Sequence, residues 1–190
     1  MRDLNPKARV AGLQRHLLAT LVLLGCTTHA HATPPFVVLV RHAEKQTEPA
    51  SDDPALSAAG QRRAQQLADA LQDADIGAII TTQFKRTQAT AAPLASKRGL
   101  TPQVIAAGAG ESHIAATAAA VREQSRGVLV VGHSNTVTAI AKALGGPTLP
   151  NLCDSSYGHV LVLQMQPTPV RMLRLRYGEA DPPATMTDCL

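Results

Sequence analysis

The sequence predicts one α/β domain, a three-layer αβα sandwich with a mainly parallel sheet, and three observations favour this class. Short Val-rich apolar runs, typical of strands buried on both faces, alternate with segments whose apolar residues recur at helical spacing. Polar and charged residues directly follow several of these runs, where open α/β sheets bind ligands. The 190 residues suffice for one domain with a real core, and no repeat or domain boundary occurs after residue 32.

The first half of the domain alternates strand and helix twice. An apolar run at residues 36–40 predicts a strand, and a polar loop rich in Pro and Asp separates it from a helix that Ser57 can cap. Residues 78–82 predict the second strand. The segment that follows directly, residues 83–97, predicts a helix that ends at Gly99.

The second half continues this alternation and ends with two strands. In chain order the predicted elements are a short strand at 101–105, an Ala-rich helix at 111–124 and a buried strand at 128–131. Residues 132–135 end that strand and open a further helix, which has apolar residues at helical spacing over 137–144 and which residues 145–147 stop. Late strands follow at 160–164 and 170–175. Strands that alternate with helices favour βαβ units and therefore a mainly parallel sheet.

Residues 1–32 have the three parts of a secretory signal peptide. Basic residues come first, an apolar run at 17–25 follows, and an A-x-A pattern at 30–32 supplies the small residues of a cleavage site. The apolar run is too short to span a bilayer. We therefore expect cleavage after Ala32, a periplasmic or secreted domain at 33–190, and no stable membrane span.

A lipoprotein signal is the alternative at the same place. Leu-Leu-Gly-Cys at residues 23–26 resembles a bacterial lipobox, in which Cys26 would be lipidated and become the mature N-terminus. The A-x-A pattern is the better match, because Leu24 is a poor fit to the small residue usually found in a lipobox.

Composition argues against nucleic acid as a partner. The whole chain carries a net charge of +4, but residues 1–32 hold four basic residues and one acid, so the remaining domain carries only +1. This charge does not support a general basic face. Aromatic residues make up 2% of the chain, which leaves little for stacking on single strands.

Two cysteines, Cys153 and Cys189, remain after the expected cleavage. An even number of cysteines in an oxidising compartment predicts a disulfide, which would tie the end of the chain after Pro182-Pro183 back onto the domain. Two unpaired thiols are the alternative. No local signature marks either cysteine as a catalytic nucleophile.

Three predicted junctions between a strand and a helix carry residues suited to a phosphoryl group. Arg41 and His42 follow the first strand, Arg86 lies in the first turns of the helix after the second, and His133 follows the strand at 128–131. A guanidinium is a planar fork for an anion, and an imidazole is a possible nucleophile. Each junction alone is compatible with a solvated turn or helix residue, so the prediction depends on all three together.

Four short motifs extend this pattern. They are Val-Arg-His-Ala-Glu at 40–44, Leu-Ser-x-x-Gly-x-x-Arg-Ala at 56–64, Lys-Arg-Thr-x-x-Thr-Ala at 85–91 and Val-Val-Gly-His-Ser-Asn at 130–135. In this order and spacing they resemble the histidine phosphatase superfamily, the phosphoglycerate-mutase-like group. The resemblance covers about residues 36–146, and the motifs are specific together although each alone is not.

The resemblance implies a covalent mechanism. His42 would be the nucleophile that forms a phosphohistidine, and water would then hydrolyse it. Arg41, Arg86 and His133 would hold the phosphate oxygens and stabilise the negative charge of the transition state, which agrees with the electrostatics of phosphoryl transfer. The motifs contain no metal-ligand cluster, so we expect no cofactor and no effect of chelators.

The resemblance leaves the proton donor open. Related proteins often place a Glu or Asp between the third and fourth motifs, where this chain has only Glu111 and Glu123 as acids. Glu111 follows a flexible Gly-rich stretch and is the first candidate, although an acid at a helix N-terminus is also favoured by the helix dipole alone. Glu44 and Asp154 are alternative donors, and His113 could also serve.

The length of the chain bears on the substrate. It leaves little room for the insertions that cap the active site in larger members of that family, so we expect an open, shallow pocket. Such a pocket favours hydrolysis over mutase chemistry, because a mutase must keep water from its phosphoenzyme. The expected activity is that of a phosphomonoesterase acting on a phosphorylated small molecule, glycan or protein side chain. A degenerate member that binds a phosphorylated ligand without turnover is the alternative.

Overall fold

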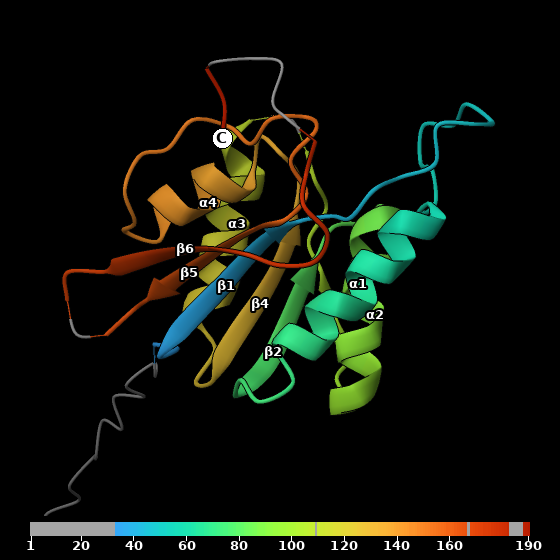
Figure 1. The fold of residues 1–190 in the computed structure, drawn as a ribbon. Helices are drawn as coiled ribbons and strands as arrows, with labels where there is room; N and C mark the ends of the chain where they lie inside the picture. The colour runs from blue at the N-terminus through green and yellow to red at the C-terminus, as the bar shows by residue number, and fades with distance from the viewer. Residues whose placement is uncertain (1–32, 109, 167, 183–187) are drawn as a thin grey trace, which may run out of the picture. The chain divides into compact units, whose positions relative to one another are not determined.

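Figure 1 shows the computed structural model, which describes residues 33–190 apart from 109, 167 and 183–187. The expected signal peptide and Cys26 lie outside the described residues. In chain order the elements are β1 (Phe36–Arg41), α1 (Ala58–Ala70), β2 (Ile76–Thr81), α2 (Lys85–Arg98), β3 (Gln103–Val104), α3 (Glu111–Arg122), β4 (Gly127–Gly132), α4 (Val137–Ala143), β5 (His159–Gln164) and β6 (Arg171–Arg176). In the part of the chain that the structure describes, no helix is long and apolar enough to cross a membrane.

Among the described residues, six strands form one sheet in the order β3-β2-β4-β1-β5-β6. β1 pairs in parallel with β4, β4 with β2, and β2 with β3. β5 runs antiparallel to both of its neighbours, β1 and β6. The sheet is therefore mainly parallel with β5 reversed, which confirms the predicted fold class.

The Val-rich strands are buried on both faces, as their apolar runs predicted. In β1, Val37 and Leu39 point into one core and Val38 and Val40 into the other, and all four are at most 2% exposed. Residues of β4 alternate between the same two cores. Because both faces are covered, these strands need no polar side, and their sequences are continuous apolar runs.

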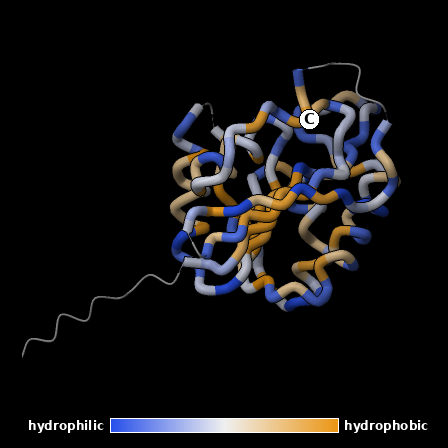
Figure 2. Tube along the Cα trace, turned by 60° about the vertical axis from the view of Figure 1, so that its left-hand side comes forward, coloured by the Kyte–Doolittle hydropathy of each residue, from blue (hydrophilic) through white to orange (hydrophobic). Residues whose placement is uncertain are grey.

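Helices cover both faces of the sheet. α1 and α2 pack against each other and contribute to the core that contains Val38 and Val40, whereas α3 and α4 contribute to the core that contains Val37 and Leu39. In Figure 2 the hydrophobic residues gather along the central strands, and hydrophilic residues predominate toward the outside. This arrangement is the predicted three-layer αβα sandwich.

All the predicted helices and strands are present, and most of their ends differ from the prediction by one or two residues. β3 has two residues rather than five, because only Gln103 and Val104 pair with β2 at the edge of the sheet. α4 begins at Val137, the first of the predicted periodic apolar residues, and residues 132–135, which were expected to open the helix, lie before it. The chain first makes a turn there, in which the Thr136 N–H donates to the His133 carbonyl (3.1 Å).

The predicted disulfide is also present. Cys153 and Cys189 are bonded, with their Cα atoms 5.0 Å apart. The bond joins residues 188–190 to the loop before β5. The carbonyl of Cys153 in that loop accepts a hydrogen bond from Arg41 at the end of β1 (2.8 Å), so the disulfide lies next to the edge where β1 ends.

The start of α1 packs directly on the chain that follows β1. Ser57 caps the helix by accepting the Gly60 N–H (3.1 Å), as predicted, and its own N–H donates to the Glu44 carbonyl (2.9 Å). A Cβ on Gly60 would overlap the carbonyl oxygen of Glu44. Only glycine permits this close approach, which holds the segment after His42 against α1.

Gly60→Ala is expected to destabilise the fold, although alanine normally favours a helix over glycine by about 1 kcal/mol. The added methyl group meets backbone atoms of Glu44, which cannot move without shifting the chain after β1. We expect the free energy of unfolding, measured by urea denaturation, to fall by about 1–3 kcal/mol, as in other overpacked cores. Gly108→Ala is the matched control, because a Cβ there meets nothing within 4 Å. Equal stability of the two variants would contradict the packing argument.

Candidate active site

The pairing of the parallel strands brings three of the four motifs together. Arg41 is in register with Gly132, and the His42 N–H donates to the Gly132 carbonyl (2.9 Å). β1 and β4 therefore end at the same edge, followed by His42 and His133, whose ring centroids lie 5.4 Å apart. β2 pairs with the other side of β4, so Arg86 in the first turn of α2 reaches the same edge.

A cavity of about 390 Å³ lies at this edge. The residues that line it include all four that the motifs predicted as nucleophile and phosphate ligands, and the lining consists of Arg41, His42, Lys45, Arg86, His133, Ser134, Asn135, Asp154 and Tyr157. Three of these side chains are permanent cations and one is a carboxylate. The cavity therefore suits an anion.

His42 is buried and held in one orientation. It is 4% exposed, and its Nδ1 lies 2.8 Å from the carbonyl oxygen of Ala43. Because a carbonyl oxygen only accepts, Nδ1 carries the hydrogen and Nε2 keeps its lone pair. Burial is the main reason why the pKa of His42 is lowered from 6.5 to about 3; the Ala43 carbonyl opposes the shift, and the positive charge of Arg41 adds to it. At neutral pH the imidazole is thus uncharged.

His133 lies beside His42 and is also neutral. Its Nε2 is 3.2 Å from Thr82 Oγ1, which in turn lies 2.9 Å from Thr87 Oγ1. Burial, followed by the nearby charge of Arg86, lowers the pKa of His133 from 6.5 to about 4. Thr82 directly follows β2 and Thr87 lies in α2, so the chain at these two elements orients the imidazole that directly follows β4.

The Arg41 guanidinium is fixed by backbone carbonyls. Its Nη1 donates to the carbonyl oxygens of Cys153 (2.8 Å), Asp154 (2.9 Å) and Ser156 (3.3 Å). The guanidinium carbon lies 4.3 Å from the centroid of the Tyr157 ring. Nη2 is 3.7 Å from Asp154 Oδ1, and the buried Nε has no hydrogen-bond partner among the described residues. Nε and Nη2 are therefore the donors that remain for an anion.

Arg86 is supported by an aromatic ring and a carboxylate. Its guanidinium carbon lies 4.2 Å from the centroid of the Phe84 ring, and its Nη1 lies 3.6 Å from Asp53 Oδ1. Asp53 comes from the loop between β1 and α1 and also accepts the Lys85 N–H at the start of α2 (3.0 Å). One carboxylate thus positions the start of α2 and balances part of the charge of Arg86.

The candidate proton donors occupy different places. Glu111 is the first residue of α3 and is not among the described residues that line the cavity. His113 is buried, with Nδ1 3.1 Å from the Ala106 carbonyl oxygen, and it does not line the cavity either. Asp154 does line it, and the Asp154 side chain is 94% exposed.

Glu44 is engaged by Arg63. Both carboxylate oxygens of Glu44 accept from Arg63 Nε, at 2.8 and 3.0 Å, and Arg63 Nη2 lies 2.8 Å from Oε1. Arg63 is 4% exposed, although the helical periodicity of α1 does not identify it as buried. A buried guanidinium requires a charged or polar partner, and Glu44 supplies it. The sequence signal that could have identified this pair is that Glu44 and Arg63 both belong to motifs.

Two further residues of the site come from loops. Tyr157 places its ring against Arg41, and Asp53 places its carboxylate beside Arg86. No pattern in the sequence identifies either residue, because neither lies in a motif or follows a predicted strand. Their contribution depends on how the loops fold over the edge of the sheet.

Residues 37–116 match the sequence model of the histidine phosphatase superfamily (branch 1). This segment contains three of the four motifs, with Arg41, His42 and Arg86. The match confirms the resemblance that the motifs indicated.

Solved structures of phosphatases from that superfamily have the same fold. The mycobacterial glucosyl-3-phosphoglycerate phosphatase is 17% identical, with a TM-score of 0.56, over 73% of this chain and 96% of its own. The protein histidine phosphatase SixA, in its complex with tungstate, is 20% identical, with a TM-score of 0.55, over 67% of this chain and 86% of its own. At these identities the comparison establishes the phosphoglycerate-mutase-like fold.

A curated sequence relative is the PE-PGRS family protein PE_PGRS11 of Mycobacterium tuberculosis, which is 38% identical over 104 residues. The match covers 54% of this chain and 17% of that protein. The chain thus corresponds to a small fraction of the length of this relative.

Lowering the pH below 6.5 is expected to destabilise the domain through His42. The pKa of this group is about 3 in the folded protein, against an ordinary value of 6.5, so between these values the unfolded chain binds the extra proton. The stability that the neutral imidazole contributes is complete above pH 6.5 and is lost as the pH falls toward 3. The slope from this group reaches about 1.4 kcal/mol per pH unit. Urea denaturation at a series of pH values measures it.

His42→Asn is the control for this titration. The asparagine amide can still donate a hydrogen bond toward the Ala43 carbonyl, but it does not titrate. We expect the stability of this variant to depend less steeply on pH below 6.5. An unchanged slope would show that other groups account for the acid sensitivity.

Proposed function

We propose that this protein is a phosphomonoesterase that works through a phosphohistidine on His42. One observation carries the proposal: His42 presents an uncharged imidazole with a free Nε2 in a cavity that it shares with Arg41, Arg86 and His133. A neutral imidazole is a nucleophile, and the other three side chains suit the oxygens of a transferring phosphoryl group. The similarity to phosphatases supports this class of activity in general.

The reaction has two steps. In the first, the lone pair of His42 Nε2 attacks phosphorus and the bond from phosphorus to the ester oxygen breaks, so the phosphoryl group stays on the imidazole and the leaving oxygen takes a proton. In the second, water attacks phosphorus, the bond from phosphorus to nitrogen breaks, and inorganic phosphate leaves. Arg41, Arg86 and His133 stabilise the charge on the phosphoryl oxygens in both steps.

The geometry favours Asp154 over Glu111 for proton transfer. Asp154 lines the cavity, with Oδ1 3.7 Å from Arg41 Nη2 and 3.5 Å from Ser134 Oγ. The same carboxyl group could protonate the leaving oxygen and then take a proton from the attacking water.

The open rim of the cavity favours a substrate whose phosphate is attached to a large molecule. The exposed side chains of Lys45 and Asp154 stand at the cavity, so a phosphate can enter while the rest of the substrate stays in solvent. With the predicted signal peptide, this favours a periplasmic or secreted enzyme that acts on a phosphorylated protein side chain or glycan, with a phosphorylated small molecule as the third class.

A protein that binds a phosphorylated ligand without turnover is the second candidate. The observation that favours it is that the carboxyl group lining the cavity, among the described residues, is exposed rather than buried. Enzymes that need a general acid at neutral pH commonly bury it to keep it protonated. The two candidates differ in whether His42 becomes phosphorylated.

His42→Asn is expected to abolish both turnover of phosphomonoesters and covalent labelling, because the variant has no nucleophilic nitrogen. Arg86→Ala and His133→Ala should each lose about 10²–10³ in rate, as for the loss of one donor to an oxyanion. Initial rates on a panel of phosphomonoesters measure turnover. Rapid quenching with a phosphorylated substrate, followed by mass spectrometry, locates an acid-labile phosphoryl group.

Each result of this experiment separates the candidates. Label on His42 together with turnover supports the phosphatase. Label on a different residue, or full activity of His42→Asn, contradicts the assigned nucleophile. Binding of phosphorylated compounds without label and without turnover favours the binding protein.

Asp154→Asn is expected to slow the hydrolysis of alkyl phosphates much more than that of aryl phosphates. A poor alkoxide leaving group depends on proton donation, which contributes about 10²–10⁴ in rate, whereas a phenolate needs little help. Glu111→Gln is the matched control and should leave both rates unchanged. If Glu111→Gln instead slows the alkyl substrates selectively, Glu111 is the donor. The measurement is the ratio of kcat/KM for the two substrate types in each variant.

A further inference from the structure

We propose that residues after β6 position the phosphate-binding Arg41. They do so by holding the loop at residues 153–157, which contacts Arg41; the holding residues are Asp181, Cys189 and Leu190. The inference rests on the proposed role of Arg41 as a phosphate ligand. These three holding residues are not among the described residues that line the cavity at His42, so they act through the loop rather than by touching a phosphate.

The loop at residues 153–157 holds Arg41 mainly through its backbone. Three carbonyl oxygens of the loop accept from Arg41 Nη1, and the Tyr157 ring lies 4.3 Å from the guanidinium carbon. Within the loop, the Ser156 N–H donates to the Cys153 carbonyl (2.9 Å), and no helix or strand includes these residues. The position of the guanidinium therefore depends on what holds this loop from outside.

Residues 188–190 hold the Cys153 end of the loop. The disulfide bonds Cys153 to Cys189. The Cys153 N–H donates to the Leu190 carbonyl (2.7 Å), and the Leu190 N–H donates to the Asn151 carbonyl (2.9 Å). Cys153, whose own carbonyl accepts from Arg41, is thus held by both its side chain and its backbone.

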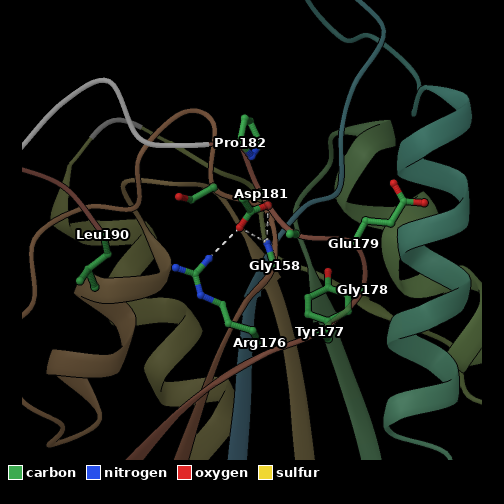
Figure 3. A pocket seen from close by; sticks show the side chains of 10 residues that line it. Gly158, Arg176, Tyr177, Gly178, Glu179, Asp181, Pro182 and Leu190 are labelled. Atoms are coloured by element: carbon green, nitrogen blue, oxygen red, sulfur yellow. Dashed lines mark hydrogen bonds and ion pairs between the residues drawn. The ribbon is translucent and has the colours of Figure 1, made fainter.

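Asp181 holds the Tyr157 end. Its side chain is 6% exposed, and its carboxylate accepts the Tyr157 N–H (2.9 Å) and the Gly158 N–H (2.9 Å) and pairs with Arg176 Nη1 (2.7 Å). Asp181 and Leu190 both line a cavity of about 520 Å³. Figure 3 shows the Asp181 carboxylate joined by dashed lines to Gly158 and Arg176. Both ends of the loop are therefore attached to residues that follow β6.

Both attachments of the loop, at Asp181 and at Cys189 with Leu190, affect the position of the Arg41 guanidinium. Misplacement of a catalytic or binding group by about 1 Å can cost about 10²-fold in rate, because charge-assisted hydrogen bonds depend steeply on geometry. Removing an attachment should therefore weaken phosphate binding although no phosphate ligand has been removed. The loss should disappear when Arg41 is absent, because Asp181 and the disulfide act through it.

A double-mutant cycle with inorganic phosphate as the probe tests this coupling. Phosphorus NMR titration, which detects weak binding, measures phosphate affinity for the wild-type chain, for Asp181→Asn and for the double variant Cys153→Ser/Cys189→Ser. Each is repeated in an Arg41→Ala background. We expect each change to weaken binding about 10- to 100-fold with Arg41 present, and less than about 2-fold without it.

Asp69→Asn is the matched control for Asp181→Asn. Asp69 pairs with Lys97 on the exposed surface of α1 and α2, and its loss should leave phosphate affinity unchanged. Thermal unfolding establishes that each variant is folded. Asp181→Asn, which nearly preserves shape and volume, decides the question by itself if the serine variant does not fold.

Two results would overturn the inference. One is an unchanged phosphate affinity in folded Asp181→Asn, and the other is a loss of the same size with and without Arg41, which would indicate a general effect on the fold. A wild-type chain that binds no phosphate contradicts the proposed function itself, and the inference with it.

Discussion

The hydrogen bond from the His42 N–H to the Gly132 carbonyl extends the β1–β4 ladder one residue beyond the end of β1, and the candidate site depends on it. In a parallel pair both strands end at the same edge, so the residues after each strand become neighbours. A shift of one residue in this register would turn the next side chain to the opposite face of the sheet. The observed register places His42 and His133 side by side, although they come from distant parts of the chain.

The two buried arginines of the motifs are held in different ways, and the difference matches their proposed roles. Arg63 pairs with the carboxylates of Glu44 and Asp181, which neutralise its charge and attach α1 to the chain around it. Arg63 also donates to the carbonyls of Tyr177 and Glu179. Arg41 is held mainly by three backbone carbonyls, and the carboxylate beside it, that of the exposed Asp154, lies 3.7 Å away. Carbonyl dipoles hold a guanidinium without adding a full negative charge, so Arg41 keeps its attraction for an anion.

Much of the fold and the centre of the candidate site could be predicted because their signals are local. The apolar runs at 36–40 and 128–131 mark strands buried on both faces, and the motif residues follow them directly, so their placement at one edge follows from a parallel sheet. The disulfide was predictable because only Cys153 and Cys189 remain after the expected cleavage. The short β3 was less predictable, since a strand at the edge of a sheet is limited by the partner it finds.

The sequence by itself thus determined the order of the elements, the residues at the strand ends and the cysteine pair. Only the tertiary structure decided that Asp154 and Tyr157 line the cavity, that Glu111 does not, and that Asp181 supports the loop around Arg41. The physical reason is the range of the interactions. Helix and strand formation depends on neighbours a few positions away, whereas the bond from Arg41 to the Asp154 carbonyl joins residues 113 positions apart. Their meeting requires the strand order of the whole sheet and the path of the chain after β6, which no local pattern encodes.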